Sequence, residues 1–349
     1  MIRTVGLAVA LLIGAPGFSA VALAEGKIVI SNWDGYMPKD LPEKFKAETG
    51  IEVEVAVHAT NEDIMGKVVA SGGKGYDVLF VSSPFAEALA KLGIAGKIDH
   101  SKIPNLTNLY PEAAALKHDP GNQFSIPYAW GTTGLCYRSD IVKEAPDSWN
   151  DLLKPDEALK GKTTMLATDR WLMGAGELAL GMSVNETDPA KLEQVKALLT
   201  DAKKTLLAYD DTTFYSKLVS GEAHLVQAWD GWCNYGITEN DKIKYVVPKE
   251  GSDLWVDTMV VVGNSPNQEA AHKFIDYILK PDTGKWVAEN IMYKVPNKAA
   301  MDALDKAMFE KYPNLAYAPA DLLKYEQLRD LGEGMKTFSK VVTEVMSAK

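Results

Sequence analysis

Strand-like and helix-like segments alternate between residues 27 and 91, and this alternation constrains the fold more than any other feature. Residues 51–57 (IEVEVAV) alternate apolar and polar side chains with period two, which is typical of a half-buried strand. Strands are expected at 27–32, 51–57 and 76–81, and helices at 38–49, from an Asn61 cap and from Ser83-Pro84. This β-α-β-α-β order predicts a parallel sheet flanked by helices.

A second unit follows a segment of different composition. Residues 125–134 (SIPYAWGTTG) combine proline, aromatic residues, glycine and threonine, which disfavours a helix and suits a segment that crosses between two units. Asp188-Pro189 is expected to begin a long amphipathic helix, 254–262 a strand, and 266–279 another helix. Because the sequence contains neither a proline-rich linker nor a repeat, we expect two α/β lobes joined by more than one crossing.

The N-terminus has the pattern of a secretory signal peptide. Arg3 precedes an apolar stretch at 5–13, and Ala22-Leu23-Ala24 matches a cleavage site, so we expect residues 1–24 to be removed. No cysteine follows this site, and no apolar run is long enough to span a bilayer. We therefore expect an exported, periplasmic protein without a lipid anchor.

Net charge and cysteine content limit the kinds of ligand and of cysteine chemistry that we expect. The formal net charge is −10, and loss of Arg3 with the signal peptide makes it −11, which disfavours nucleic acid and mildly favours a cationic ligand. The chain has two cysteines, Cys136 and Cys233. In an exported protein this number predicts one disulfide rather than a redox pair or a metal site.

Motifs for catalysis or metal binding are not found. The five histidines include no pair at helical spacing, and the glycine-rich stretch 71–75 lacks the ending of a phosphate-binding loop. No nucleophile-elbow motif occurs either. We therefore predict no metal, no cofactor and no catalytic residue, and we expect a protein that is not an enzyme.

Aromatic residues recur beside carboxylates at expected strand ends. A carboxylate supplies charge to an organic ammonium, while an aromatic face adds cation–π attraction and apolar contact. Trp232 could instead belong to the core, and each aromatic residue could be structural beside a solvated acid. The candidate groups are Trp33, Asp34 and Tyr36; Trp229 and Asp230; Trp255 and Asp257; and Tyr293.

At these positions the chain resembles the periplasmic spermidine/putrescine-binding proteins of ABC transporters. The similarity covers essentially the whole mature sequence. It is carried by the stretches 31–36, 125–131 (SIPYAWG), 248–251 (PKEG) leading to Trp255 and Asp257, and 293–297. The combination is specific although each motif alone is weak.

The resemblance implies an α/β fold of the two-lobed periplasmic binding protein clamshell, type II-like, in which each lobe is a central sheet flanked by helices. On this basis lobe 1 comprises 25–131 and 257–303, and lobe 2 comprises 132–256 and 304–349. The protein would bind a small amine between the lobes as a monomer, without nucleic acid, and deliver it to a membrane permease and its ATPase.

The resemblance also implies roles for individual residues. Trp33 and Tyr36 would wall the cleft, with Ser82 nearby, and Trp229 and Trp255 would sandwich an alkyl chain. Asp257, helped by Tyr293, would bind an ammonium group. Asp169 stands where the family has an acid in its second lobe, and Gln327 lies near a family glutamine. Cys233 is expected to pack in the second lobe, bridged to Cys136.

The sequence departs from the family at the far end of the expected site. Leu172 stands where spermidine binders offer a glutamate, and Arg170 adds a guanidinium. If Arg170 points into the cleft, the ligand would be a zwitterion such as γ-aminobutyrate; if it points away or pairs with Asp169, a polyamine such as putrescine remains suited. A sensing subunit of a membrane signalling protein is the alternative to transport, and an enzyme is a third possibility.

Overall fold

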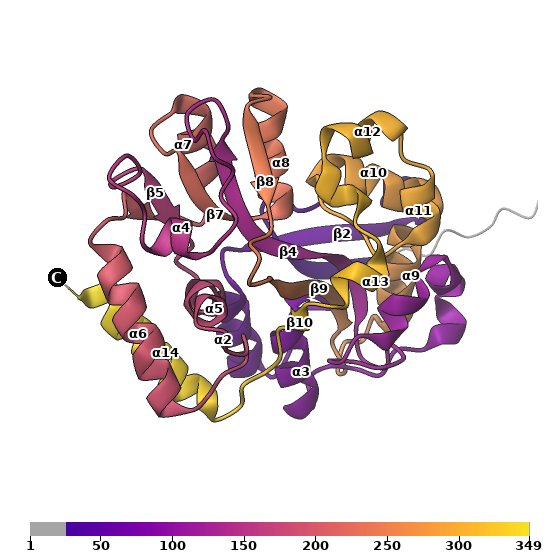
Figure 1. Ribbon diagram of the computed structural model, residues 1–349. Helices are drawn as coiled ribbons and strands as arrows, with labels where there is room; N and C mark the ends of the chain where they lie inside the picture. The colour runs from indigo at the N-terminus through magenta and orange to yellow at the C-terminus, as the bar shows by residue number, and fades with distance from the viewer. Residues whose placement is uncertain (1–25, 349) are drawn as a thin grey trace, which may run out of the picture.

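A single path of paired strands runs through both lobes in the computed structural model of the chain, which describes residues 26–348 (Figure 1). The order is β2-β1-β3-β9-β4-β7-β5-β6, with β10 beside β9 and β8 beside β4. The strands are β1 (Gly26–Trp33), β2 (Ile51–His58), β3 (Val78–Ser82), β4 (Ile126–Arg138), β5 (Thr163–Met165), β6 (Ala208–Tyr209), β7 (Leu225–Trp229), β8 (Ile243–Val246), β9 (Asp253–Val261) and β10 (Glu326–Gln327).

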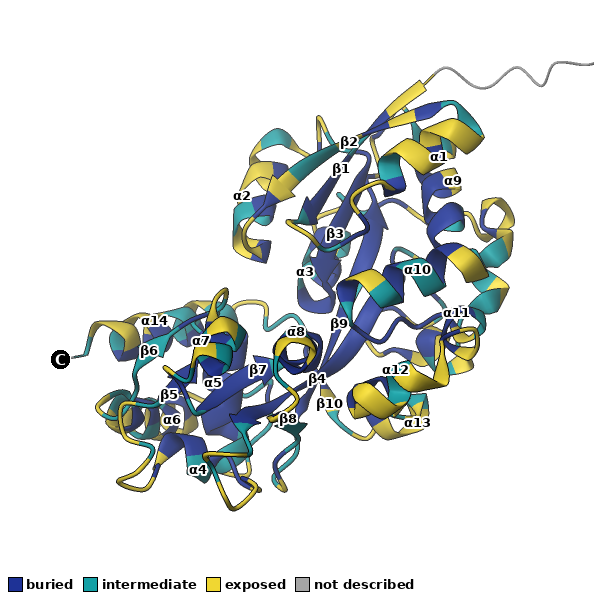
Figure 2. Cartoon of the chain, turned by 90° about the horizontal axis from the view of Figure 1, so that it is seen from above, coloured by how far each residue is buried: buried dark blue, intermediate teal, exposed yellow. Residues whose placement is uncertain are grey.

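Helices cover the sheet on both sides of this path (Figures 1 and 2). They are α1 (Leu41–Thr49), α2 (Asn61–Ser71), α3 (Ser83–Lys91), α4 (Asn150–Leu153), α5 (Asp169–Ala179), α6 (Pro189–Lys203), α7 (Phe214–Ser220), α8 (Asp230–Glu239), α9 (Gln268–Ile278), α10 (Pro281–Ile291), α11 (Lys298–Asp302), α12 (Lys306–Lys311), α13 (Pro319–Leu322) and α14 (Gly334–Ser347). Within residues 26–348 none of these helices has the length and apolar character needed to cross a membrane. The predicted signal peptide lies outside the described residues.

The path divides into a first sheet, made of β1, β2, β3, β9, β10 and the first half of β4, and a second sheet, made of the second half of β4 and β5 to β8. The first sheet confirms the parallel arrangement predicted from the sequence. Strand β1 pairs in parallel with β2 and with β3, and β9 returns antiparallel to β3. One predicted boundary is wrong by a residue: Thr60, not Asn61, caps α2, because the Thr60 side chain accepts a hydrogen bond from the Asp63 backbone N–H. Asn61 is therefore the first helical residue and its side chain is free for another contact.

Strand β4 joins the two lobes by changing partners in its middle. Thr132 is its last residue paired with β9, opposite Leu254, and Thr133 is its first paired with β7, opposite Trp229. The Thr132 N–H donates to Asp230 Oδ2 (3.0 Å) and the Thr133 N–H to Ser252 Oγ (2.9 Å). These side chains satisfy backbone groups at the point where one sheet ends and the other begins.

The chain crosses between the lobes in β4, again between β8 and β9, and again between β10 and α14 (Figure 2). The lobe boundaries expected from the sequence remain a proposal. Helix α14 packs against α6 and α5, as expected for lobe 2. Leu322, however, packs with Trp130 and Leu254 of the first sheet. On these contacts the proposed second lobe takes α14 rather than the whole of 304–349.

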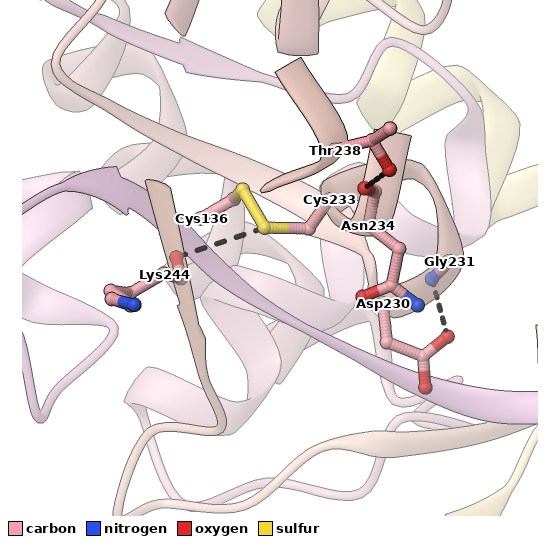
Figure 3. The surroundings of a disulfide bond; sticks show 7 residues. All are labelled: Cys136, Asp230, Gly231, Cys233, Asn234, Thr238 and Lys244. Carbon is pink, nitrogen blue, oxygen red and sulfur yellow. Dashed lines mark hydrogen bonds between the residues drawn. A yellow bond between two sulfur atoms is a disulfide. The ribbon is translucent and has the colours of Figure 1, made fainter. Parts of the chain in front are cut away.

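A disulfide fixes α8 to the crossing strand. Cys136 of β4 and Cys233 of α8 are bonded, with Cα atoms 5.9 Å apart, which confirms the predicted pairing (Figure 3). Both residues are fully buried. Because β7 lies beside β4 and leads directly into α8, the bond holds the start of α8 near the point at which β4 changes partners.

Candidate functional site

The site is built around the carboxylate of Asp257, which lies in the middle of β9. Strand β3 runs antiparallel to β9 and its last residue, Ser82, is paired with Asp257. The Ser82 hydroxyl donates to Asp257 Oδ1 (2.7 Å), and the hydroxyl of Tyr36, three residues after the end of β1, donates to Oδ2 (2.8 Å). The ends of two parallel strands thus hold one carboxylate in a fixed orientation.

The two donors are themselves held in place. Asn61 donates from Nδ2 to Ser82 Oγ (3.1 Å) and accepts the Ser82 backbone N–H at Oδ1 (2.9 Å). The Tyr128 hydroxyl donates to the backbone carbonyl of Tyr36 (2.7 Å). Asn61 is therefore a positioning residue that sequence reasoning missed. Its only signal was its place at a helix start, and that position was interpreted as a cap.

Burial raises the pKa of Asp257 to about 6, because little water remains to solvate the charge, while the bonds from Ser82 and Tyr36 act in the opposite direction. At neutral pH the group is an anion that accepts two hydrogen bonds. A carboxylate has about four acceptor positions. It can thus accept further hydrogen bonds from a cation.

Aromatic rings surround this carboxylate. Tyr36 meets Trp33 edge-on with ring centroids 5.5 Å apart and Tyr293 at 5.6 Å, and Tyr293 meets Trp255 at 5.2 Å. The close approach of Tyr293 depends on a glycine, since a Cβ at Gly231 would lie 2.3 Å from the tyrosine ring. The structure therefore brings together these predicted residues around Asp257. Asp34, by contrast, is exposed.

Residues 224–236 (HLVQAWDGWCNYG) contain two tryptophans, Trp229 and Trp232, which have different surroundings. Trp229, half-buried at the end of β7, meets Trp171 edge-on with ring centroids 5.3 Å apart. Trp232 packs among Phe214, Tyr215 and Tyr235. The alternative that Trp232 is structural agrees with these contacts. Trp229 remains a predicted ligand residue.

A second group of carboxylates comes from both lobes. Asp169 begins α5 and accepts a hydrogen bond from Ser339 (2.9 Å), and Asp211 accepts from the Ala167 N–H (2.7 Å). Glu62 belongs to the first turn of α2 in the other lobe. Its side chain remains accessible, yet partial loss of water raises its pKa, and the charges of Asp169 and Asp211 raise it further. Asp169 and Asp211 therefore both lie within electrostatic reach of Glu62.

Sequence reasoning found Asp169 in this group but missed Glu62 and Asp211. Glu62 lies in the first turn of α2, where an acid already suits the helix N-terminus, so its residue type gives no separate signal of binding. Asp211 follows the two-residue strand β6, which is too short to leave a periodic signal. Ligand residues often follow the end of a strand. Because β6 could not be recognised in the sequence, Asp211 was not identified as a candidate.

Arg170 does not point toward these acids. Its guanidinium donates to the backbone carbonyls of Arg329 (2.7 Å) and Val184 (3.0 Å) and to the side chain of Asn185 (2.7 Å). The residue is buried, with 3% of its surface exposed. The condition under which the sequence favoured a zwitterion, an arginine directed at the ligand, is thus not met.

Two other predicted residues have structural contacts. Asp230 is buried at the change of partners in β4, where it accepts the N–H groups of Thr132 and of Gly231 (2.7 Å; Figure 3). Burial raises its pKa to about 7. Gln327 accepts the Lys117 N–H (2.8 Å) and contacts His118 (2.6 Å). No hydrogen bond joins either side chain to the Asp257 carboxylate. Their places in the site were predicted from sequence, which does not fix the direction of a side chain.

Metal chemistry finds no support among the described residues. In the part of the chain from 26 to 348, no group of three or more His, Cys, Asp or Glu side chains could hold a metal ion. The three acids between the lobes and the Asp257 carboxylate instead form two separate anionic centres, with aromatic rings beside the second. Such an arrangement can bind a cation with ammonium groups at both ends.

Comparison with known proteins gives one consistent result. The model of the family described as bacterial extracellular solute-binding protein matches residues 40–317. The spermidine/putrescine-binding periplasmic protein 1 of Haemophilus influenzae is 32% identical over 333 residues, covering 95% of this chain and 91% of that protein. The spermidine/putrescine-binding periplasmic protein of Escherichia coli is 34% identical over 274 residues, 78% of each chain.

Solved structures agree. The substrate-binding protein of a spermidine/putrescine ABC transporter from Streptococcus pneumoniae has a TM-score of 0.78 and 29% identity, covering 92% of this chain and 99% of that chain. This agreement along the chain confirms the predicted two-lobed α/β clamshell. On the family match and the identity to curated relatives, the chain belongs to the bacterial extracellular solute-binding proteins.

Proposed function

We propose that the protein is the substrate-binding subunit of an ABC importer and that its ligand is a polyamine of the putrescine or spermidine type. The single observation that carries this proposal is the Asp257 carboxylate, oriented by Ser82 and Tyr36 and surrounded by aromatic rings. The names of the relatives from Haemophilus influenzae and Escherichia coli support the same ligand class. The protein would work in the periplasm and catalyse no reaction.

At the Asp257 end, the ligand ammonium would donate to the carboxylate. Charge-assisted hydrogen bonds of this kind are stronger than neutral ones, and they strengthen further where water is excluded. The rings of Tyr36, Tyr293 and Trp255 add cation–π attraction and contact for methylene groups. Because Ser82 and Tyr36 already hold the carboxylate, little ordering is needed when the ligand arrives.

At the other end, Glu62, Asp169 and Asp211 would bind a second ammonium. Together these acids would supply the negative charge of the glutamate that the sequence lacks at Leu172. Two of them come from outside α5, since Glu62 belongs to α2 and Asp211 follows β6. Burial is the main cause of the raised Glu62 pKa, and a cation between the acids would offset the part that comes from the charges of Asp169 and Asp211. Negative charge at both ends disfavours a zwitterion, whose carboxylate would face these acids without help from Arg170.

Transport follows from the two-lobed architecture. A diamine held at both ends makes contacts with both lobes and so favours the closed form over the open form. The closed, loaded form would be the one that the membrane permease and its ATPase accept. We expect the protein to act as a monomer.

A ligand series tests this proposal. Calorimetric titration should give the affinity order putrescine, then n-butylamine, then γ-aminobutyrate, because only the diamine satisfies both anionic ends. In the Glu62→Gln, Asp211→Asn double variant, putrescine affinity should fall by roughly tenfold or more, while n-butylamine affinity stays unchanged.

The control is Glu157→Gln, a change at a carboxylate whose side chain is 88% exposed and which lies outside the proposed site. Equal affinities for putrescine and n-butylamine would contradict the two-ended site. Tight binding of γ-aminobutyrate would contradict the polyamine.

A further inference from the structure

A cavity of about 380 Å³ lies beside the point at which β4 changes partners, between Thr132 and Thr133, which is called the hinge below. Asp257 is not among its lining residues. One wall is β8 with the residue that follows it, and the other is the segment from Tyr317 to Tyr325. Figure 2 shows β8 and α13 near the crossing of β4 and β9. The lining residues are Tyr245, Val246, Val247, Tyr317, Asp321, Leu322 and Tyr325.

The two walls belong to different parts of the fold. Strand β8 pairs with the half of β4 that lies in the second sheet. Leu322, in contrast, packs with Trp130 and Leu254 of the first sheet. The cavity therefore spans the junction at which the lobes meet, and none of its lining residues contributes to the site around Asp257.

The lining is aromatic and negative. It contains three tyrosine rings and one carboxylate, that of Asp321, and no lysine or arginine. Burial raises the pKa of Tyr317 to about 12, so its hydroxyl is neutral, and the negative charge of the nearby Asp230 contributes to that rise. Burial is the main cause that raises the pKa of Tyr245, and the charge of Asp230 raises it further. The potential inside the cavity is accordingly suited to a cation.

Two lysines bond to residues in or just before the second wall, and neither of them lines the cavity. Lys324 is 75% exposed and pairs with Asp321 (2.6 Å), a surface ion pair of the kind that contributes little to stability. Lys294 is buried and donates from Nζ to the Leu315 carbonyl (2.8 Å). Asp321 is thus able to exchange its lysine for another cation at small cost.

We propose that this cavity is a second binding site, for a small organic cation of the alkylammonium class. Its volume falls in the range of about 300–1,000 Å³ that is usual for small-molecule sites. Tyrosine faces attract ammonium groups, and quaternary ammonium ions are bound by aromatic cages of this composition. The Asp321 carboxylate supplies the counter-charge at the edge of the cage.

Occupation of this site would act on the hinge. The Tyr245 hydroxyl lies 2.9 Å from Thr132 Oγ1, and Thr132 is the residue at which β4 leaves β9. A cation that contacts Tyr245 on one wall and Tyr325 on the other links the two lobes at their present separation. The affinity at the Asp257 site should therefore change when this second site is filled, because the two binding equilibria are coupled through lobe closure.

The test uses tetramethylammonium as the probe, added to the mature protein that carries Asp257→Asn to disable the main site. Ligand-observed NMR should detect binding that Tyr325→Leu weakens roughly fivefold, whereas Tyr325→Phe, which keeps the ring, changes it little. Asp321→Lys should weaken it by roughly tenfold. The control is Tyr76→Leu, a half-buried tyrosine of the first lobe outside the cavity.

No binding of tetramethylammonium, or binding that is the same in all cavity variants, would overturn the proposal. Because Asp321 is exposed, the Asp321→Lys variant remains informative even if Tyr325→Leu does not fold. Failure of this proposal can be told apart from failure of the polyamine proposal, because the cavity is tested in the Asp257→Asn variant, whereas putrescine binding is tested in the wild-type protein.

Discussion

A buried carboxylate is costly for a folded protein unless something offsets the loss of water, and Asp257 shows how this chain meets that cost. Two hydroxyl groups donate to its two oxygens, and Asn61 and Tyr128 hold those donors. No lysine or arginine side chain bonds to it among the contacts that the described residues make. The charge of Asp257 is thus left for a ligand cation, and this is the residue-level reason to regard it as a binding group.

The pH dependence of amine binding should follow the pKa of Asp257. Burial raises that pKa to about 6, so below this pH the carboxyl group is mostly protonated and cannot pair with an ammonium. Putrescine affinity should therefore be nearly constant above pH 7 and fall roughly tenfold for each pH unit well below 6. Calorimetry between pH 4.5 and 8 measures this, and an affinity independent of pH below 6 would exclude Asp257 as the anchor.

Glu177 should govern part of the pH dependence of folding stability. It is completely buried, its carboxyl oxygens have no hydrogen-bond partner, and burial raises its pKa from 4.5 to about 8. Between these values the folded protein keeps the proton that the unfolded chain releases, so the free energy of unfolding decreases as pH rises. Glu177→Gln should remove a slope of about 1.4 kcal/mol per pH unit in this window.

Denaturant unfolding at pH 5.5, 6.5 and 7.5 provides the measurement, with Glu157→Gln as the exposed control. Parallel pH profiles for the wild type and Glu177→Gln would show that Glu177 is ionised in the folded protein.

Residue type and strand position predicted the aromatic residues that the structure brings together near Asp257. Trp33, Tyr36, Trp255 and Asp257 do lie at the ends or along the faces of strands that periodicity predicts. The sequence could not show where Arg170 points, because the carbonyl groups that bind its guanidinium come from distant segments. For the same reason the sequence could not show that Asp230 accepts a hydrogen bond from the Thr132 N–H at the point where β4 changes partners.

At the scale of elements, strand β4 is the piece that makes two lobes out of one chain. It carries Pro127, Gly131 and Gly134, and glycine is required where other groups approach closely. A Cβ at Gly131 would lie 2.5 Å from Asp230 Oδ2, and one at Gly134 would lie 2.4 Å from the Val246 carbonyl. These residues made 125–134 recognisable as a crossing segment, whereas the exchange of strand partners inside it depends on pairing that sequence alone does not specify.

The disulfide between β4 and α8 should stabilise the second lobe. It links residues 97 apart in sequence, and the chain-entropy model gives about 4.7 kcal/mol for a loop of that size, with 2–4 kcal/mol typical of measured cases. The Cys136→Ala, Cys233→Ala double variant should therefore lose roughly 2–4 kcal/mol in denaturant unfolding. An unchanged midpoint, or two alkylated thiols in the native wild type, would contradict a structural role for this bond.

At the scale of the whole molecule, the two ends of the proposed ligand site come from different parts of the fold. Asp257 and Trp255 belong to β9 of the first sheet, while Asp169 begins α5 and Asp211 follows β6, which belongs to the second sheet. The alternating pattern predicted the class of each lobe, because burial imposes periodicity on sequence. The proximity of Glu62 to Asp169 was not predictable, since it depends on how the lobes are set relative to each other.

The central claim is that Asp257 anchors the ammonium group of a polyamine. The most direct measurement is calorimetric titration of the mature protein with putrescine, comparing the wild type with Asp257→Asn, which keeps the shape of the side chain and removes its charge. The control is Asp241→Asn, a change at a carboxylate that is 83% exposed. We predict that Asp257→Asn weakens binding by roughly 2–5 kcal/mol and that Asp241→Asn has no effect. Equal putrescine affinities for Asp257→Asn and the wild type would contradict the account.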